Sequence, residues 1–252
     1  TFLNNSHPAN GGVLAMFGSP TSALDQSLTF NNNTWRGNQA KTGGCVYLEG
    51  SPGRKTILVD LESVVENQAL LGDGGFLALS TPASQVTVTL LHSQFTGNAA
   101  NGMGGVVSVS GCSSLVLTVD GCEMADSQAI SGGVLYAQGN MFTANTHQFC
   151  LLNSQFYRNK ATHGGGILGS NVQLGTQELT VYNSVLQDNT ATNHGGVLIL
   201  SATNNVAVQS VNIAQNVIRG GSATFGGILS FEISGVMNPI QSIHLQDNSV
   251  TN

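Results

Sequence analysis

Apolar and polar residues alternate along many short stretches of the chain. Clear examples are residues 86–90, 115–119 and 179–182, which are also rich in β-branched side chains. A period of two is typical of β-strands that bury one face, whereas an amphipathic helix needs a period near 3.6. The pattern therefore predicts an all-β protein built from short strands.

A pair of glycines recurs along the whole chain at a nearly constant spacing. There are eight such pairs, 28 to 33 residues apart, and two mostly apolar residues follow each pair. We expect the pairs to supply positive φ angles or close backbone approach at a repeated turn. The second glycines are Gly12, Gly44, Gly75, Gly105, Gly133, Gly166, Gly196 and Gly227.

A second motif, an apolar residue three positions before an asparagine, alternates with the glycine pairs. One copy departs and reads Met124-x-x-Ser127. We expect the apolar residue to point inward, and the asparagine amide to bond a neighbouring backbone group or the next asparagine at a corner. The asparagines are Asn5, Asn38, Asn67, Asn98, Asn159, Asn189, Asn216 and Asn248.

A repeat of about 30 residues with short strands fits a parallel β-helix better than a propeller, whose blades run to about 40 residues. In a parallel β-helix, equivalent residues stack about 4.8 Å apart, which explains identical residues at a fixed period. We expect about eight coils in one domain over residues 1–252. Because the chain begins and ends inside the same motif, we interpret it as part of a longer solenoid.

The two motifs together resemble the repeats of the polymorphic membrane proteins of chlamydiae, which carry Phe-x-x-Asn and Gly-Gly-Ala-apolar sequences. Here the closest copies are Phe95-x-x-Asn98 and Phe156-x-x-Asn159. Similar repeats occur in surface proteins of some algae and protists. The resemblance implies a right-handed parallel β-helix outside a cell, acting in adhesion or as a structural unit of a surface layer or filament. Its expected partners are other copies, other parts of a larger surface protein, carbohydrate or a host-cell protein.

Charge is scarce, with 20 charged residues of 252 and a formal net charge of -6. No Lys/Arg cluster is present, which argues against nucleic acid as a partner. No apolar run reaches the roughly 18 residues of a membrane-spanning helix, so we expect no transmembrane segment in this chain.

Parallel β-helices also include polysaccharide lyases and hydrolases, which is the alternative function. Such enzymes need acidic side chains close together on one face. The positions before the corner asparagines include Asp126, Arg158 and Asp188, which predicts a surface charge ladder. Asp120 and Glu123 join Asp126 as a candidate acidic cluster, for which a solvated face is the preferred interpretation. We therefore expect no catalytic residues and no cofactor.

Histidines and cysteines supply the remaining candidates. His163 and His194 each precede a glycine turn one coil apart, so we expect their rings about 5 Å from each other. We expect no metal there, since no third ligand is evident.

The four cysteines are Cys45, Cys112, Cys122 and Cys150. Cys112 and Cys122 are the candidate disulfide, with Cys122 to Cys150 or free buried thiols as alternatives. Two glycosylation sequons place acceptors at Asn4 and Asn32.

Overall fold

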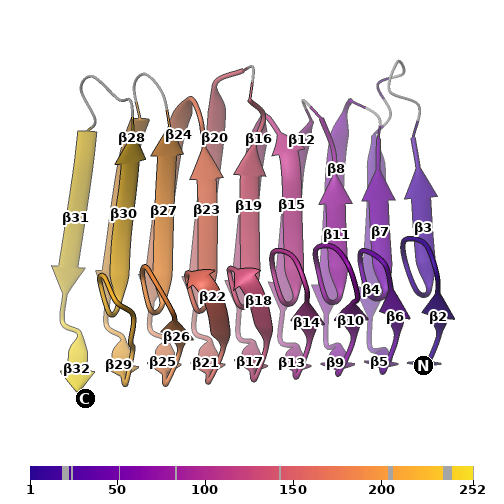
Figure 1. Ribbon diagram of the computed structural model, residues 1–252, viewed down its shortest axis with the longest axis horizontal. Coiled ribbons are helices and arrows are strands. Elements are labelled where there is room, and N and C mark those ends of the chain that lie inside the picture. The colour runs from indigo at the N-terminus through magenta and orange to yellow at the C-terminus, as the bar shows by residue number, and fades with distance from the viewer. Residues whose placement is uncertain are drawn as a thin grey trace.

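The computed structural model describes residues 1–18, 23, 25–50, 52–82, 84–141, 143–203, 207–234 and 240–251. These residues form 32 β-strands in four parallel sheets, and no helix occurs among them. The sheets stack as a β-solenoid of about seven turns of ~31 residues, which confirms the predicted all-β parallel β-helix. The two termini lie at opposite ends of the stack (Figure 1).

The strands follow one another in the chain order D, A, B, C, except that no strand of sheet B lies among the described residues between β29 and β30. Sheet D holds the longest strands, and sheet A follows it around the coil. Sheet D consists of β4 (Gln26–Asn31), β8 (Arg54–Asp60), β12 (Gln85–Leu91), β16 (Ser114–Asp120), β20 (Asn145–Leu152), β24 (Gly175–Tyr182), β28 (Ala207–Ala214) and β31 (Ile240–Gln246). Sheet A consists of β1 (Phe2–Leu3), β5 (Thr34–Arg36), β9 (Ser63–Val65), β13 (Gln94–Thr96), β17 (Glu123–Ala125), β21 (Gln155–Tyr157), β25 (Val185–Gln187), β29 (Val217–Arg219) and β32 (Ser249–Thr251).

Sheet B is the narrowest sheet, and sheet C leads back toward sheet D. Sheet B consists of β2 (Ser6–His7), β6 (Gln39–Ala40), β10 (Gln68–Ala69), β14 (Ala99–Ala100), β18 (Gln128–Ser131), β22 (Lys160–Gly164) and β26 (Thr190–Ala191). Sheet C consists of β3 (Leu14–Phe17), β7 (Val46–Glu49), β11 (Leu77–Ser80), β15 (Val107–Cys112), β19 (Leu135–Gly139), β23 (Leu168–Val172), β27 (Leu198–Thr203) and β30 (Leu229–Ser234).

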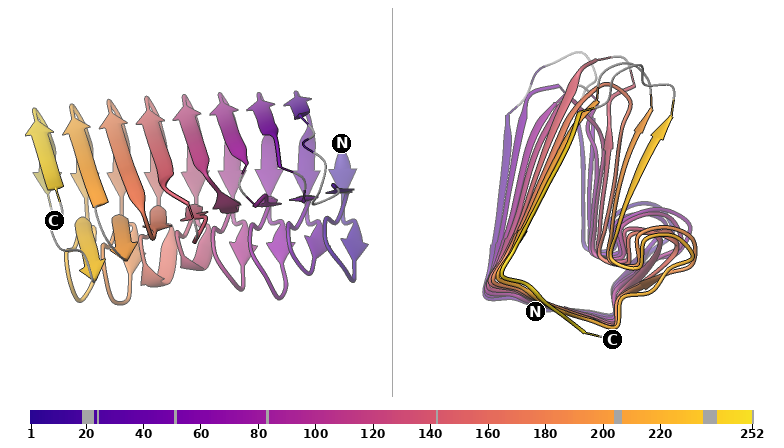
Figure 2. Two further views of the ribbon diagram at one scale, coloured as in Figure 1. Left: turned by 90° about the horizontal axis from the view of Figure 1, so that it is seen from above. Right: turned by 90° about the vertical axis from the view of Figure 1, so that its left-hand side faces the viewer.

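The coils superimpose when viewed along the stack, and a rounded loop projects sideways from them between sheets B and C (Figure 2). We call these segments the side loops; residues 41–45 are one example. The core lies between sheets C and D and is closed by sheet A. The apolar residues of the asparagine motif stack there as predicted: Trp35 pairs with Val64, and Val64 with Phe95, all fully buried.

Each glycine of a pair answers a different steric demand. The first has a positive φ, as at Gly74 with 67°. The second packs against the next coil, so that a Cβ built on Gly75 would overlap the carbonyl oxygen of Gly105. The same overlap recurs from Gly12 through Gly196, which explains why no side chain occupies these positions.

Two corners of every coil turn through a residue in the left-handed region. Their φ angles lie between 44° and 65°, where glycine and asparagine are favoured. At the corner between sheets A and B these residues are Asn4, Gly37, Glu66, Gly97, Asp126, Arg158, Asp188 and Gly220. At the corner between sheets D and A they are Asn32, Leu61, His92, Gly121, Asn153, Asn183, Gln215 and Asp247.

Candidate functional site

A ladder of buried asparagines runs along the corner between sheets A and B. Asn38 donates from its backbone N and its Nδ2 to Asn67 Oδ1, at 3.0 and 2.9 Å. Asn67 repeats both bonds to Asn98, and its Nδ2 also donates to the carbonyl of Trp35. Asn159 binds Asn189 in the same way. The amides of Asn38, Asn67 and Asn159 therefore each tie three consecutive coils together, as the motif predicts.

A second ladder, with mixed chemistry, follows the corner between sheets D and A. Glu62, which is 3% exposed, accepts hydrogen bonds from Trp35 Nε1 at 2.6 Å and from Asn33 Nδ2 at 3.0 Å. Farther along, Ser184 Oγ accepts from the backbone N of Ser154. Serine, glutamate and asparagine side chains thus perform one structural role, and no single residue type marks it in the sequence.

The structure places Asn216 and Asn248 in this second ladder. The backbone N of Ser184 donates to Asn216 Oδ1 at 2.9 Å, and the backbone N of Asn216 donates to Asn248 Oδ1 at 3.0 Å. Leu186 pairs instead with Ile218, so that Gly221 takes the position that follows Asn189. The predicted phase was wrong here because apolar-x-x-Asn occurs at both corners; the short interval of 27 residues from Asn189 to Asn216 was the available signal.

The predicted charge ladder occurs at the corner between sheets A and B. Arg158 donates from Nε and NH2 to the two carboxylate oxygens of Asp126, at 2.8 and 2.7 Å. This bond lowers the pKa of Asp126. Asp120 lies at the other corner, where it accepts a bond from Asn153, so β17 separates it from Asp126 and the three acids do not form one cluster. Among the described residues, no group of three or more His, Cys, Asp or Glu side chains is arranged to hold a metal ion.

All four cysteines are free thiols. The disulfide predicted between Cys112 and Cys122 is wrong, because the whole of β16 (Ser114–Asp120) separates them. Seven extended residues span roughly 20 Å, whereas a disulfide requires Cα atoms within about 7 Å. Cys112 is instead buried with its Sγ 3.7 Å from His147 Nε2, and burial raises its pKa to about 12.

The two sequon asparagines are exposed at separate corners. Asn4 turns the corner between sheets A and B, and Asn32 the corner between sheets D and A. Their side chains are therefore accessible on the surface of the first coils.

His163, near the end of β22, and His194, in the side loop of the next coil, lie next to each other with ring centroids 5.8 Å apart, close to the predicted distance. His194 Nδ1 lies 3.2 Å from Glu232 Oε1, and its ring stacks on Phe225 at 5.1 Å. Asn193 Nδ2 lies 3.4 Å from His163 Nδ1. Both rings thus have protein partners, and His163 lies in the wall of a groove.

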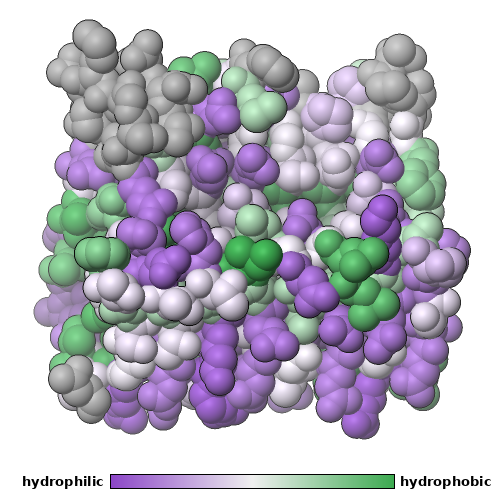
Figure 3. Space-filling model, viewed as in Figure 1, coloured by the Kyte–Doolittle hydropathy of each residue, from purple (hydrophilic) through white to green (hydrophobic). Residues whose placement is uncertain are grey.

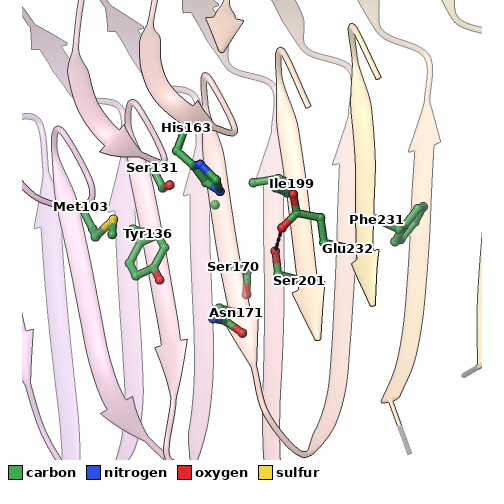
Figure 4. A pocket seen from close by; sticks show the side chains of 11 residues that line it. Met103, Ser131, Tyr136, His163, Ser170, Asn171, Ile199, Ser201, Phe231 and Glu232 are labelled. Carbon is green, nitrogen blue, oxygen red and sulfur yellow. Dashed lines mark hydrogen bonds between the residues drawn. The ribbon is translucent and has the colours of Figure 1, made fainter. Parts of the chain in front are cut away.

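That groove lies over the outer face of sheet C and has a volume of about 610 Å³. The groove is lined from β19, β23, β27 and β30 by Tyr136, Asn171, Ser201 and Glu232, and from the end of β22 by His163 (Figure 4). Ser201 Oγ donates to Glu232 Oε2 at 3.1 Å. The surrounding face is mainly polar, with a few separate apolar residues (Figure 3).

Two features of the groove bear on ligand chemistry. Asn171 Oδ1 is buried and has no hydrogen-bond partner. Gly169 lies beside Tyr136, and a Cβ there would come within 3.1 Å of the tyrosine Cδ2. The groove thus contains an aromatic ring, a buried acceptor without a partner and a carboxylate. Sequence reasoning missed this site because the outward residues of sheet C do not repeat from coil to coil.

No family model matches the chain, and neither a curated protein nor a solved structure matches it. No helix that could span a membrane is found within the described ranges.

Proposed function

We propose that this protein is a noncatalytic extracellular or cell-surface β-solenoid that acts in adhesion or as a structural unit of a surface layer or filament. The observation that carries the proposal is the stacking of the two corner ladders, which join successive coils by side-chain hydrogen bonds along most of their length. Such a stack is a rigid rod that holds its outer faces at fixed spacing.

The use of charge supports the same proposal. Described ion pairs join one coil to the next, as in Arg36 with Glu66 and Arg158 with Asp126. Exposed pairs of this kind are individually weak, but they offset like-charge repulsion along the stacked positions. Glu66 and Asp126 thereby stabilise the contact between neighbouring coils. Glycoside hydrolysis instead requires two carboxylates on either side of a bound sugar.

The surface location is tested by labelling intact producing cells with an amine-reactive biotin that does not cross membranes. Lys41 and Lys160 are exposed and provide the reactive amines. The proposal expects biotin on the protein before lysis, and weaker attachment or a disrupted surface layer in cells that lack it. Labelling that appears only after lysis, beside an already labelled surface control, would overturn the location.

A further inference from the structure

We propose that the groove over sheet C, lined by Tyr136, Asn171, Ser201, Glu232 and His163, binds a neutral oligosaccharide that lies along the solenoid axis. The inference rests on the proposed function, because it names the ligand class of an adhesive surface. It is carried by the position and chemistry of the groove residues.

The groove has the length and direction that an extended glycan needs. Asn171, Ser201 and Glu232 form one row, because each pairs with the next across adjacent strands of sheet C. Adjacent strands lie about 4.8 Å apart, a spacing similar to the length of one pyranose unit in a glycan chain. Successive sugar units would therefore meet successive coils.

The row offers hydrogen-bond groups suited to sugar hydroxyls. Asn171 Oδ1 is a buried acceptor without a partner, so a hydroxyl donor would remove the cost of leaving it unpaired. Ser201 and Glu232 are already bonded to each other, which fixes the carboxylate while leaving further lone pairs to accept hydroxyls. Precisely positioned groups of this kind confer specificity in a largely preformed site.

Tyr136 supplies the apolar surface for a sugar ring. Its aromatic face sits beside Gly169, whose missing side chain leaves the ring room to lie against the sheet. The ring is half-buried, so little freedom is lost when a ligand stacks on it. Ile199, in the same row as Tyr136 and Gly169, extends the apolar strip.

The charge of the groove favours a neutral sugar over an acidic one. Glu232 contributes a carboxylate, and the described lining contains no Lys or Arg to pair with a uronate. A peptide strand is also disfavoured, because β19, β23 and β27 each pair on both sides and leave no free edge within the groove. Recognition must therefore come from side chains.

The test is calorimetric titration of the folded chain with neutral hexasaccharides of glucose, xylose, mannose and N-acetylglucosamine, with oligogalacturonate as the acidic comparison. We expect saturable binding of at least one neutral probe. Tyr136→Ala should weaken that binding roughly tenfold, the loss of about one aromatic contact. Tyr182→Ala, which truncates a tyrosine 40% exposed on sheet D, is the matched control and should leave affinity unchanged.

Glu232→Gln provides a second variant that keeps the shape of the groove if Tyr136→Ala fails to fold; it should also weaken binding. The inference is overturned if no neutral probe binds at millimolar concentration, if only oligogalacturonate or a peptide binds, or if both groove variants bind like the unmodified chain. Surface labelling of intact cells would still succeed in those cases, so failure of the groove and failure of the proposed function are distinguishable.

Discussion

Asn67 Oδ1 accepts two hydrogen bonds from Asn38, one from the backbone N at 3.0 Å and one from Nδ2 at 2.9 Å. Both asparagines are fully buried. One side chain thus satisfies two donors of the neighbouring coil, so the corner is stabilised only when coils stack in register.

Replacing Asn67 with alanine should lower the free energy of unfolding by about 3 kcal/mol, because several buried partners lose their bonds. Denaturant unfolding followed by circular dichroism measures the change. Asn5→Ala is the matched control at the exposed end of the ladder, and should cost less than about 1 kcal/mol. Equal losses in the two variants would mean that the buried amides do not hold the coils together.

The ladder has a gap at Ser127, which is buried but too short to accept the amide of Asn98. Asn98 Nδ2 turns instead to the carbonyl of Thr96 at 3.3 Å. Ser127→Asn should complete the ladder and raise stability by about 1 kcal/mol. Ser127→Ala, which cannot accept the bond, should not raise it. A less stable Ser127→Asn variant would show that the gap is required by packing.

Gly75→Ala should prevent correct stacking, because the new Cβ would overlap the carbonyl oxygen of Gly105. We expect a loss of at least about 4 kcal/mol or failure to fold. Gly97→Asn is the control: Gly97 has φ 65° but an open surrounding, and asparagine tolerates that region. Its thermal unfolding should match that of the unmodified chain, and a mild effect at Gly75 would refute the close-approach account.

His147 predicts a pH dependence. Burial lowers its pKa from 6.5 to about 4, and its ring contacts Cys112 Sγ and Ser170 Oγ. As pH falls from 6.5 to 4, the unfolded state binds a proton that the folded state does not. Stability present above pH 6.5 is therefore lost, by about 3 kcal/mol in full.

His147→Gln should remove this part of the pH dependence. The side chain matches the buried Gln177 and Gln209 that follow His147 in the same inward column of sheet D. Denaturant unfolding at pH 7 and pH 4 would be compared for both proteins, since carboxylates contribute alike to each. Identical losses on acidification would show that the buried imidazole is not responsible.

The sequence was sufficient for features that repeat in every coil. The glycine pairs could be predicted because the steric overlap that a Cβ would cause at Gly75 recurs at each turn. The buried asparagines could be predicted because Asn38 and Asn67 make the same hydrogen bonds to the next coil. The second ladder was missed because Glu62, Ser154 and Asn216 accept equivalent backbone bonds with different side chains. Because the acceptors differ chemically, no single residue type recurs at a fixed period in the sequence.

The groove could not be predicted for a related reason. Outward positions of sheet C are not constrained by stacking. One row across the sheet therefore holds three chemically different residues, Tyr136, Gly169 and Ile199. One wall of the groove also depends on the end of β22, which brings His163 beside sheet C. Only the folded arrangement brings these residues together.

The central claim, a noncatalytic rod that binds through its outer face, is tested most directly by incubating the folded chain with a neutral oligosaccharide that it retains. Bound sugar and newly formed reducing ends or unsaturated products would be measured over time in the same samples. The account predicts saturable binding with the oligosaccharide recovered intact. Steady formation of shorter or unsaturated products, abolished by Glu232→Gln, would contradict it and identify a carbohydrate-active enzyme.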